Sequence, residues 1–245
     1  MMAPAKQAVV LVGGRGTRLG PLTKAKPKPM LDVAGRPFLE YQLEFLRQSG
    51  IEEIVFCAGY LPESLQAHFG KGDHRGLRIR FCIEEQPAGT GGAVKLAVAH
   101  LEELFYVLNG DTIFEADLAR LGLALQAARE ATAAVALREV DDASRFGRVR
   151  LEGGFVTDFA EKSAAGPGLI NGGTYCLRRE ATNLLPEGTS SLESDLFPVL
   201  AQQRRLIGIP FTGYFLDIGL PETLARAQTE LPGWLARFQE RWSKS

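Results

Sequence analysis

A stretch near the start of the chain joins bare backbone to cationic side chains. The apolar run 8–12 leads directly into three glycines and two arginines, which are Gly13, Gly14, Arg15, Gly16 and Arg18. Because glycine has no Cβ, its backbone N–H can come close to a phosphate oxygen, and arginine adds positive charge and directed hydrogen bonds. These residue types at this spacing favour the binding of a polyphosphate.

A lysine follows on a stiff segment. Lys28 stands between Pro27 and Pro29. Each proline fixes its own φ and biases the residue before it toward an extended backbone, so the lysine is held in one direction. A cation that must stay aimed at a phosphate suits such a segment.

Two common phosphate motifs are absent. The dinucleotide fingerprint G-x-G-x-x-G fails in both of its possible registers, because Leu19 replaces the third glycine in one and Val94 replaces it in the other. No Gly-Lys-Ser or Gly-Lys-Thr sequence completes a Walker loop. The glycine loop therefore belongs to another class, and an NAD(P)-binding oxidoreductase is disfavoured.

The hydrophobic pattern of the first half alternates between strands and helices. Strands are predicted over 8–12, 54–58, 77–83 and 105–108, and helices over 37–49, 62–69 and 90–101. This order is typical of an α/β fold with a Rossmann-like, doubly wound, mostly parallel sheet.

Ligands of such sheets bind at the carboxyl ends of the strands. The glycine loop, the segment 84–90 and Asp111 each follow a predicted strand. We therefore expect these three segments to meet at one edge of the sheet. Asp217 follows a further short strand and provides a second carboxylate in the same kind of position.

The second half is less regular. Its strands are predicted over 132–140, 169–177, 206–211 and 214–216, with a hairpin over 147–151 and 155–160 and helical segments over 190–203 and after Pro221. The length of 245 residues suits one large domain.

Composition sets limits on partners and location. The chain is 45% hydrophobic and 23% charged, with a formal net charge of -1. Binding to nucleic acid or to a membrane surface normally needs a basic excess, so neither is expected. There is no apolar stretch of 18 residues and no signal-peptide pattern, and the three cysteines are scattered, which predicts reduced thiols. We expect a cytoplasmic protein.

The motifs, taken in order, resemble those of the sugar-1-phosphate nucleotidyltransferases, also called nucleotide-sugar pyrophosphorylases. The resemblance covers nearly the whole chain. Within the family, the segments 109–112, 169–173 and 214–219 look most like the guanylyltransferases of D-glycero-α-D-manno-heptose 1-phosphate. The matching motifs are the glycine loop with Pro27-Lys28-Pro29-Met30, then Gly89-Thr90-Gly91-Gly92, Asn109-Gly110-Asp111, Phe146-Gly147, Glu161-Lys162, Asn171-Gly172-Gly173 and Asp217-Ile218-Gly219.

The resemblance implies a GT-A-like fold of the nucleotide-diphospho-sugar transferase type. Residues 1–130 would form a nucleotide-binding half, 131–230 a sugar-phosphate-binding half and 231–245 a C-terminal helix, all within a single domain. The implied substrates are a nucleoside triphosphate and a sugar 1-phosphate. The sugar phosphate would attack the α-phosphorus in line, with Mg²⁺ as cofactor, and pyrophosphate would leave without a covalent enzyme intermediate.

The resemblance also implies residue roles. Arg18 and Lys28 would be the catalytic cations, and Asp111 and Asp217 would hold Mg²⁺, an ion that prefers oxygen ligands. Nucleotide contacts are implied for Leu11, Gly13, Gly14, Arg15, Gly16, Thr17, Glu84, Gly89 and Thr90. Sugar-phosphate contacts are implied for Asn109, Gly147, Glu161, Lys162, Asn171 and Gly172.

The choice of base depends on a carboxylate. In the family, the residue three positions before the proline at this sheet edge contacts the base, and counting back from Pro87 gives Glu84. Guanine offers two adjacent N–H donors that suit a carboxylate, whereas uracil and thymine flank their single N–H with carbonyls. GTP is therefore favoured, with Glu85 as the alternative register.

Several alternatives stay open at this point. Asp111 could be a turn residue, and Glu161 with Lys162 a solvated surface pair. The preferred sugar of the resemblance is the heptose, and the alternatives are a mannose-1-phosphate guanylyltransferase and a uridylyl- or thymidylyltransferase for the 1-phosphate of glucose or N-acetylmuramic acid. The alternative of another class is a nucleotide-sugar sensor without turnover. The segment 163–168 could act as a lid, and the segment 234–242 could pack on the domain or form a homodimer contact.

Overall fold

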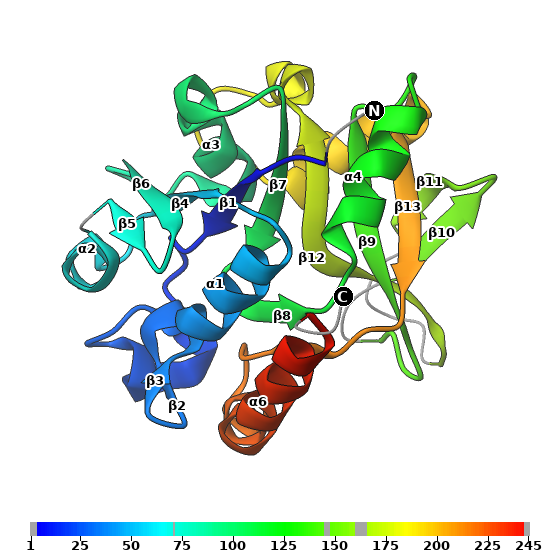
Figure 1. Cartoon of the computed structure of the whole chain (residues 1–245). Coiled ribbons are helices and arrows are strands. Elements are labelled where there is room, and N and C mark those ends of the chain that lie inside the picture. The colour runs from blue at the N-terminus through cyan, green and yellow to red at the C-terminus, as the bar shows by residue number, and fades with distance from the viewer. Residues whose placement is uncertain (1–3, 71, 145–147, 160–165, 243–245) are drawn as a thin grey trace.

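The computed structural model describes residues 4–70, 72–144, 148–159 and 166–242. Among these residues, ten strands form one sheet in the order β10-β11-β13-β9-β12-β7-β1-β4-β6-β5 (Figure 1). Seven of the ten strands point in one direction, and β5, β11 and β12 point in the other. The sheet is mixed and mostly parallel, as the sequence predicts.

The first half follows the predicted order of elements. Its main strands are β1 (Gln7–Leu11), β4 (Glu53–Ala58), β6 (Leu77–Ile83) and β7 (Leu104–Asn109), and its helices are α1 (Phe38–Gln48), α2 (Pro62–Phe69) and α3 (Gly89–Leu96). Helix α3 is shorter than predicted, because a 3₁₀ turn (Val98–His100) replaces its last residues. Three very short strands, β2 (Asp32–Val33), β3 (Arg36–Pro37) and β5 (Asp73–His74), lie between these elements.

Side chains of the central strands alternate between two cores. On β1, Ala8 and Val10 face a core that includes residues of α1, α2, α4 and α6. Val9 faces the opposite core, which includes residues of α3 and α5. All three side chains are fully buried. Helices therefore cover both faces of the parallel strands, and this explains why the strand sequences are continuous apolar runs.

The second half joins the first through an antiparallel strand. Strand β12 (Gly168–Arg178) pairs with β7 on one side and with β9 (Ala133–Val140) on the other. Beyond β9 lie β13 (Leu206–Phe211) and the hairpin of β10 (Val149–Glu152) and β11 (Phe155–Phe159). The helical segment before β13 consists of a π-helix (Leu192–Leu196) followed by α5 (Phe197–Gln202), which begins one residue before Pro198.

Several elements have no counterpart in the sequence prediction. Helix α4 (Leu118–Ala127) begins at Asp117, whose side chain accepts a hydrogen bond from the backbone N–H of Arg120. Strand β8 (Thr112–Phe114) pairs with β14 (Phe215–Asp217) in a small separate sheet. Three 3₁₀ segments complete the chain: Thr17–Thr23, Lys28–Met30 and Arg179–Leu184.

The last helix packs on the body of the domain. Helix α6 (Pro221–Trp242) begins at Pro221, after which helical segments were predicted, and it runs without a break across residue 231. Trp234 is 2% exposed and its ring centroid lies 6.3 Å from that of Phe45 on α1. The segment around Trp234 is thus part of the internal core. Within the described residues, no helix is both long enough and apolar enough to cross a membrane.

Candidate active site

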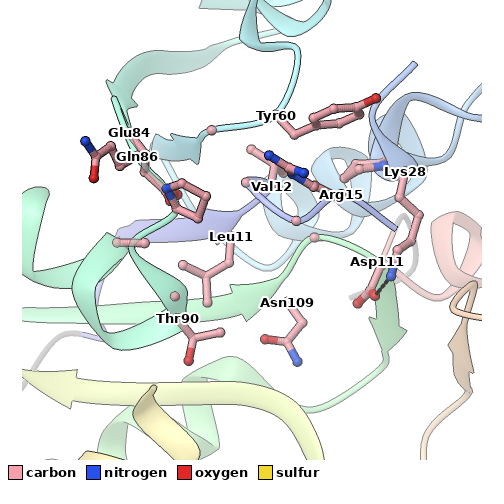
Figure 2. Close-up of a pocket in the computed structure, with 18 of the residues that line it drawn as sticks. Leu11, Val12, Arg15, Lys28, Tyr60, Glu84, Gln86, Thr90, Asn109 and Asp111 are labelled. Atoms are coloured by element: carbon pink, nitrogen blue, oxygen red, sulfur yellow. Dashed lines mark hydrogen bonds and ion pairs between the residues drawn. The ribbon is translucent and has the colours of Figure 1, made fainter. Parts of the chain in front are cut away.

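A cavity of about 520 Å³ opens at the carboxyl ends of β1, β4, β6 and β7. The first turn of α3 completes its wall. Figure 2 shows Glu84 at one end of the cavity and Lys28 with Asp111 at the other. The prediction that three segments meet at one sheet edge is confirmed, and the end of β4 adds a fourth segment. The predicted site residues that line the cavity are Leu11, Gly13, Gly14, Arg15, Lys28, Glu84, Gly89, Thr90, Asn109 and Asp111.

Two glycines of the loop after β1 are required by close neighbours. A Cβ on Gly13 would collide with the carboxylate of Glu84, so this glycine makes room for that side chain. Gly16 has a φ of +63°, and a Cβ there would lie 2.9 Å from Cγ2 of Thr23 and 3.2 Å from Cβ of Lys28. The loop thus folds tightly around the stem of Lys28 and leaves its backbone exposed to the cavity.

The ion pair of Lys28 with Asp111 lies at one end of the cavity. Nζ of Lys28 is 2.5 Å from Oδ2 of Asp111, and the two side chains are 11% and 26% exposed. Pro27 is extended, but Lys28 begins a short buried 3₁₀ segment instead of the extended backbone that Pro29 was expected to favour. The lysine is therefore held by burial and by its ion pair. A pair with so little solvent around it is screened less than a surface pair. It provides a fixed positive charge next to a carboxylate that can bind metal.

Glu84 is a buried carboxylate at the opposite end. Its Oε2 accepts a hydrogen bond from the backbone N–H of Ala88 at 3.0 Å, and its side chain lies between Gly13 and Gly59. Glu85 also lines the cavity, but it is exposed. The carboxylate that is fixed in orientation is therefore that of Glu84.

Two thiols lie beneath Glu84 at paired positions of β4 and β6. Cys57 is opposite Cys82 in the parallel register. A hydrogen bond between the thiols lowers the pKa of Cys82 to about 7 and, together with burial, raises the pKa of Cys57. The described residues contain free thiols at all three cysteines.

The two predicted metal ligands come from neighbouring strands. Thr112, directly after Asp111, is paired with Asp217 between β8 and β14. The backbone N–H of Ile218 donates to the carbonyl of Asp111 at 2.9 Å. Oδ1 of Asp217 accepts from the N–H of Gly219 at 2.9 Å. The small sheet thus brings the two aspartates into one region, which the sequence alone does not reveal because β8 was not predicted.

Arg18 lies on the Asp217 side of this region. A Cβ on Gly219 would lie 2.8 Å from Oδ1 of Asp217 and 3.4 Å from Nη2 of Arg18. Arg18 is exposed and does not line the cavity. Its guanidinium is therefore near the second carboxylate.

A hydrogen-bond network connects α3 to β12 through a residue that the sequence prediction missed. Glu193, in the π-helix, accepts from the hydroxyl of Thr90 at 2.7 Å and from that of Tyr175 at 3.1 Å. Nδ2 of Asn171 donates to the Tyr175 hydroxyl at 3.0 Å, and Ser191 also donates to Glu193. Burial raises the pKa of Tyr175 well above its usual range. π-helices are frequent at functional sites, but no local sequence motif announces this one.

Other predicted residues lie outside the cavity lining or outside the described residues. A Cβ on Gly172 would collide with the ring of Phe114, so packing explains this glycine. Gly16, Thr17, Arg18, Asn171, Gly172 and Asp217 do not line the cavity. Gly147, Glu161 and Lys162 lie outside the described residues, together with Phe146 and residues 163–165 of the expected lid segment.

The end of β4 contributes residues that the sequence prediction missed. Gly59 and Tyr60 line the cavity directly after this strand. The Tyr60 hydroxyl donates to the carbonyl of Lys24 at 3.2 Å and thereby ties the end of β4 to the segment before Lys28. The rule that ligands bind at strand ends would have found both residues if it had been applied to the predicted strand 54–58.

Known proteins are similar to this chain in sequence and fold. The family model for nucleotidyl transferases matches residues 7–232. A D-glycero-alpha-D-manno-heptose 1-phosphate guanylyltransferase of Campylobacter jejuni is 36% identical over 217 residues, which are 88% of this chain and 96% of the relative. A mannose-1-phosphate guanylyltransferase of Mycobacterium tuberculosis is 38% identical over 230 residues, which are 91% of this chain and 64% of the relative. The crystal structure of HddC from Yersinia pseudotuberculosis has a TM-score of 0.81 and 32% identity, and the match covers 91% of this chain and 98% of that one. The same protein complexed with GMP-PN has a TM-score of 0.78.

Proposed function

Because this chain belongs to the nucleotidyl transferase family, we propose that it transfers a guanylyl group from GTP to a sugar 1-phosphate and releases pyrophosphate. The observation that carries the proposal is the polarity of the cavity. A buried carboxylate suited to a base stands at one end, and a lysine–aspartate pair suited to phosphates stands at the other. A nucleoside triphosphate has the same two chemically different ends.

The reaction makes one bond and breaks one. An oxygen of the sugar phosphate attacks the α-phosphorus in line, and the bond from that phosphorus to the bridging oxygen of the β-phosphate breaks. Because no covalent enzyme intermediate is needed, catalysis depends on positioning and on neutralisation of charge. Lys28 would neutralise the α-phosphate or the incoming phosphate, while Arg18 and the N–H groups of the glycine loop would hold the outer phosphates.

Asp111 and Asp217 would hold Mg²⁺. Mg²⁺ is usually bound by one or two carboxylates, with water and substrate phosphates as the other ligands. The described residues fit this mode, since they contain two aspartates joined through β8 and β14 and no cluster of three ligand side chains. When bound, the ion would stabilise negative charge on the leaving pyrophosphate. Lys28 is paired with Asp111 in the free protein and would be released toward phosphate.

Glu84 would select guanine. Its carboxylate is held by the N–H of Ala88 and flanked by Gly13 and Gly59, so it presents oxygen acceptors in a fixed direction. Guanine offers N1–H and N2–H side by side, and a carboxylate can accept both. The carbonyls of uracil or thymine would be repelled there. The relative crystallised with GMP-PN supports the same choice of nucleotide.

D-glycero-α-D-manno-heptose 1-phosphate is the sugar substrate that we favour, and mannose 1-phosphate is the alternative. This chain matches two heptose 1-phosphate guanylyltransferases over 96% and 100% of their own length. It matches the mannose-1-phosphate guanylyltransferase over 64% of that enzyme's length. Asn109 and Asn171, together with Glu161, Lys162 and the backbone at 147 and 172, would contact the sugar phosphate.

One matrix of assays tests the proposal. Pyrophosphate release is measured with Mg²⁺ for GTP, ATP, UTP and dTTP against the 1-phosphates of heptose, mannose, glucose and N-acetylmuramic acid. We expect the highest kcat/KM for GTP with heptose 1-phosphate. A preference for UTP or dTTP would contradict the proposal that the chain transfers a guanylyl group. A preference for mannose 1-phosphate would identify mannose 1-phosphate, and not the heptose 1-phosphate, as the sugar substrate. Tight GTP binding without any pyrophosphate release would instead indicate a sensor.

A further inference from the structure

A buried glutamine on α1 contacts the segment that carries Asp111. Gln42 is 1% exposed. Its Nε2 donates to the carbonyl of Asn109 at 2.9 Å and to the carbonyl of Thr112 at 2.8 Å. These two carbonyls bracket Gly110 and Asp111. One amide group therefore holds both ends of the turn that presents the carboxylate to the cavity.

The backbone of the same turn is also held by hydrogen bonds to neighbouring backbone, while the Asp111 carboxylate itself is bonded by Lys28 and by the hydroxyl of Thr112. The N–H of Gly110 donates to the carbonyl of Leu11 at 3.0 Å, and a Cβ on Gly110 would lie only 2.6 Å from that oxygen. The carbonyl of Asp111 accepts from the N–H of Ile218. Gln42 is thus the side chain that completes a set of contacts otherwise made by β1 and by the start of the segment after β14.

The chemistry of the contact suits an amide. Two carbonyl oxygens face the same group, and the NH₂ of glutamine offers two hydrogens without placing an unpaired charge in the core. The carboxylate of a glutamate would face the carbonyl oxygens of Asn109 and Thr112 with oxygen acceptors only, and would be repelled. The Oε1 of Gln42 is buried without a hydrogen-bond partner among the described residues, which is unfavourable in general. An apolar side chain of the same length would avoid that cost but would leave the carbonyls of Asn109 and Thr112 without this donor.

We propose that Gln42 is a positioning residue for Asp111. It does not line the cavity, and it acts by fixing the turn 109–112 so that the carboxylate meets Lys28 in the free protein and the metal during the reaction. The inference rests on the proposed function, since that function gives the position of Asp111 its importance. Residues of this kind behind a metal ligand typically change metal affinity or activity by about 10- to 100-fold when removed.

The test compares Gln42→Met with Gln48→Met. Gln48 lies on the same helix, donates one hydrogen bond to Glu44 at 2.6 Å and also has a buried Oε1 without a partner. The same substitution there is therefore a matched control for loss of a buried amide from α1. We expect Gln42→Met to lower kcat by about 10- to 100-fold, with the KM for GTP changed less than about threefold and a melting temperature close to that of Gln48→Met.

A second readout does not depend on turnover. Mn²⁺ binding, measured by electron paramagnetic resonance with a non-hydrolysable GTP analogue present, should weaken by about 10-fold in Gln42→Met, while affinity for the analogue without metal stays the same. If the role of Gln42 were purely structural, the substitution would weaken Mn²⁺ binding and the binding of the GTP analogue to the same extent. Gln42→Asn, whose amide is one methylene too short to reach both carbonyls, should reproduce the loss and covers the case that the methionine variant does not fold.

The outcomes separate this inference from the proposed function. Wild-type protein without pyrophosphate release under all conditions of the matrix would overturn the proposed function first. If the wild type turns over and Gln42→Met keeps the kcat and the Mn²⁺ affinity of Gln48→Met, Gln42 has no positioning role and the inference fails.

Discussion

At the scale of single residues, the pair of Lys28 with Asp111 is the most specific feature of the site. Both side chains are mostly buried, and they come from segments that are 83 positions apart. An ion pair buried in the core would contribute to stability only. Lys28 and Asp111 instead line a cavity, with Glu84 at its other end, so both can contact a charged ligand that enters the cavity.

We predict that Lys28→Met lowers kcat by about 100- to 1000-fold, which is the usual effect of removing a donor that stabilises developing negative charge. Pyrophosphate release under saturating substrates measures it. Lys26→Met, an exposed lysine two positions away, is the control and should keep wild-type activity. A Lys28→Met protein that folds and turns over at the rate of the control would contradict a catalytic role for Lys28.

For Glu84, the prediction concerns selectivity. Glu84→Gln should reduce the preference for GTP over UTP and dTTP, measured as ratios of kcat/KM, by about 10- to 100-fold, because one bidentate contact to a base contributes about 1–3 kcal/mol of discrimination. The neighbouring Glu85→Gln serves as control, since Glu85 lines the cavity but is exposed. Unchanged ratios in Glu84→Gln would contradict the role of Glu84 in selecting guanine. An effect confined to Glu85→Gln would assign that role to Glu85 instead.

The residue types in the sequence were enough to predict residues at both ends of the cavity. They were not enough to predict the hydrogen bonds that connect these residues to the rest of the fold. Lys28, Asp111 and Glu84 follow strands or prolines that are visible in the pattern. Glu193 and Gln42 are not, because their importance comes from hydrogen bonds between segments distant in the chain. Helical spacing places Gln42 on the same face as Leu39 and Leu46, but it does not tell which groups the amide contacts.

At the scale of elements, α1 and α6 are connected by a carboxylate. Glu44 accepts hydrogen bonds from Arg47 at 2.7 Å and Gln48 at 2.6 Å on α1, and from Gln239 on α6 at 3.1 Å. The hydrogen bond from Arg47 is the main cause that lowers the pKa of Glu44 to about 2. Since the pKa in the folded state lies below its ordinary value of 4.5, the ionised carboxylate stabilises the fold above about pH 4.5 and loses this effect as the pH falls toward 2.

Glu44→Gln should therefore lower the free energy of unfolding by about 1.5–3 kcal/mol at pH 7, the range for hydrogen bonds to charged groups. The difference from wild type should shrink as the pH falls from 4.5 toward 2. Urea unfolding at several pH values measures both. Glu130→Gln, at an exposed loop position, should show no such pH-dependent difference, and a constant difference for Glu44→Gln would contradict the role of its charge.

The main first-half elements were predictable because each buried strand or helix carries its own periodic signal. The elements that were not predicted include β8 and α4, which follow directly on β7 at the end of the first half. The strand β14 was predicted, but its pairing with β8 joins segments distant in the chain. The small β8–β14 sheet brings Asp111 and Asp217 into one region. The position of the predicted metal ligands thus became clear only from tertiary structure.

At the scale of the whole molecule, the sheet has one reversed strand at its centre. Strand β12 lies antiparallel between β7 of the first half and β9 of the second. Asn171 is part of β12, and Thr90 belongs to α3 on the nucleotide side; Glu193 and Tyr175 connect them. The nucleotide and sugar sides of the proposed site are therefore connected through the strand that joins the two halves of the fold.

This arrangement has a consequence for synthesis on the ribosome. The first half can build β1, β4, β6 and β7 as soon as residue 109 has emerged, but the free edge of β7 is covered only when residues 168–178 arrive. Until then, β7, whose residues 105–108 are buried in the finished protein, is an open edge that can pair with other chains. We expect a fragment of residues 1–130 to aggregate in solution, whereas the full chain stays dispersed, as light scattering would measure. A dispersed, folded fragment would show that the nascent chain needs no protection at this stage.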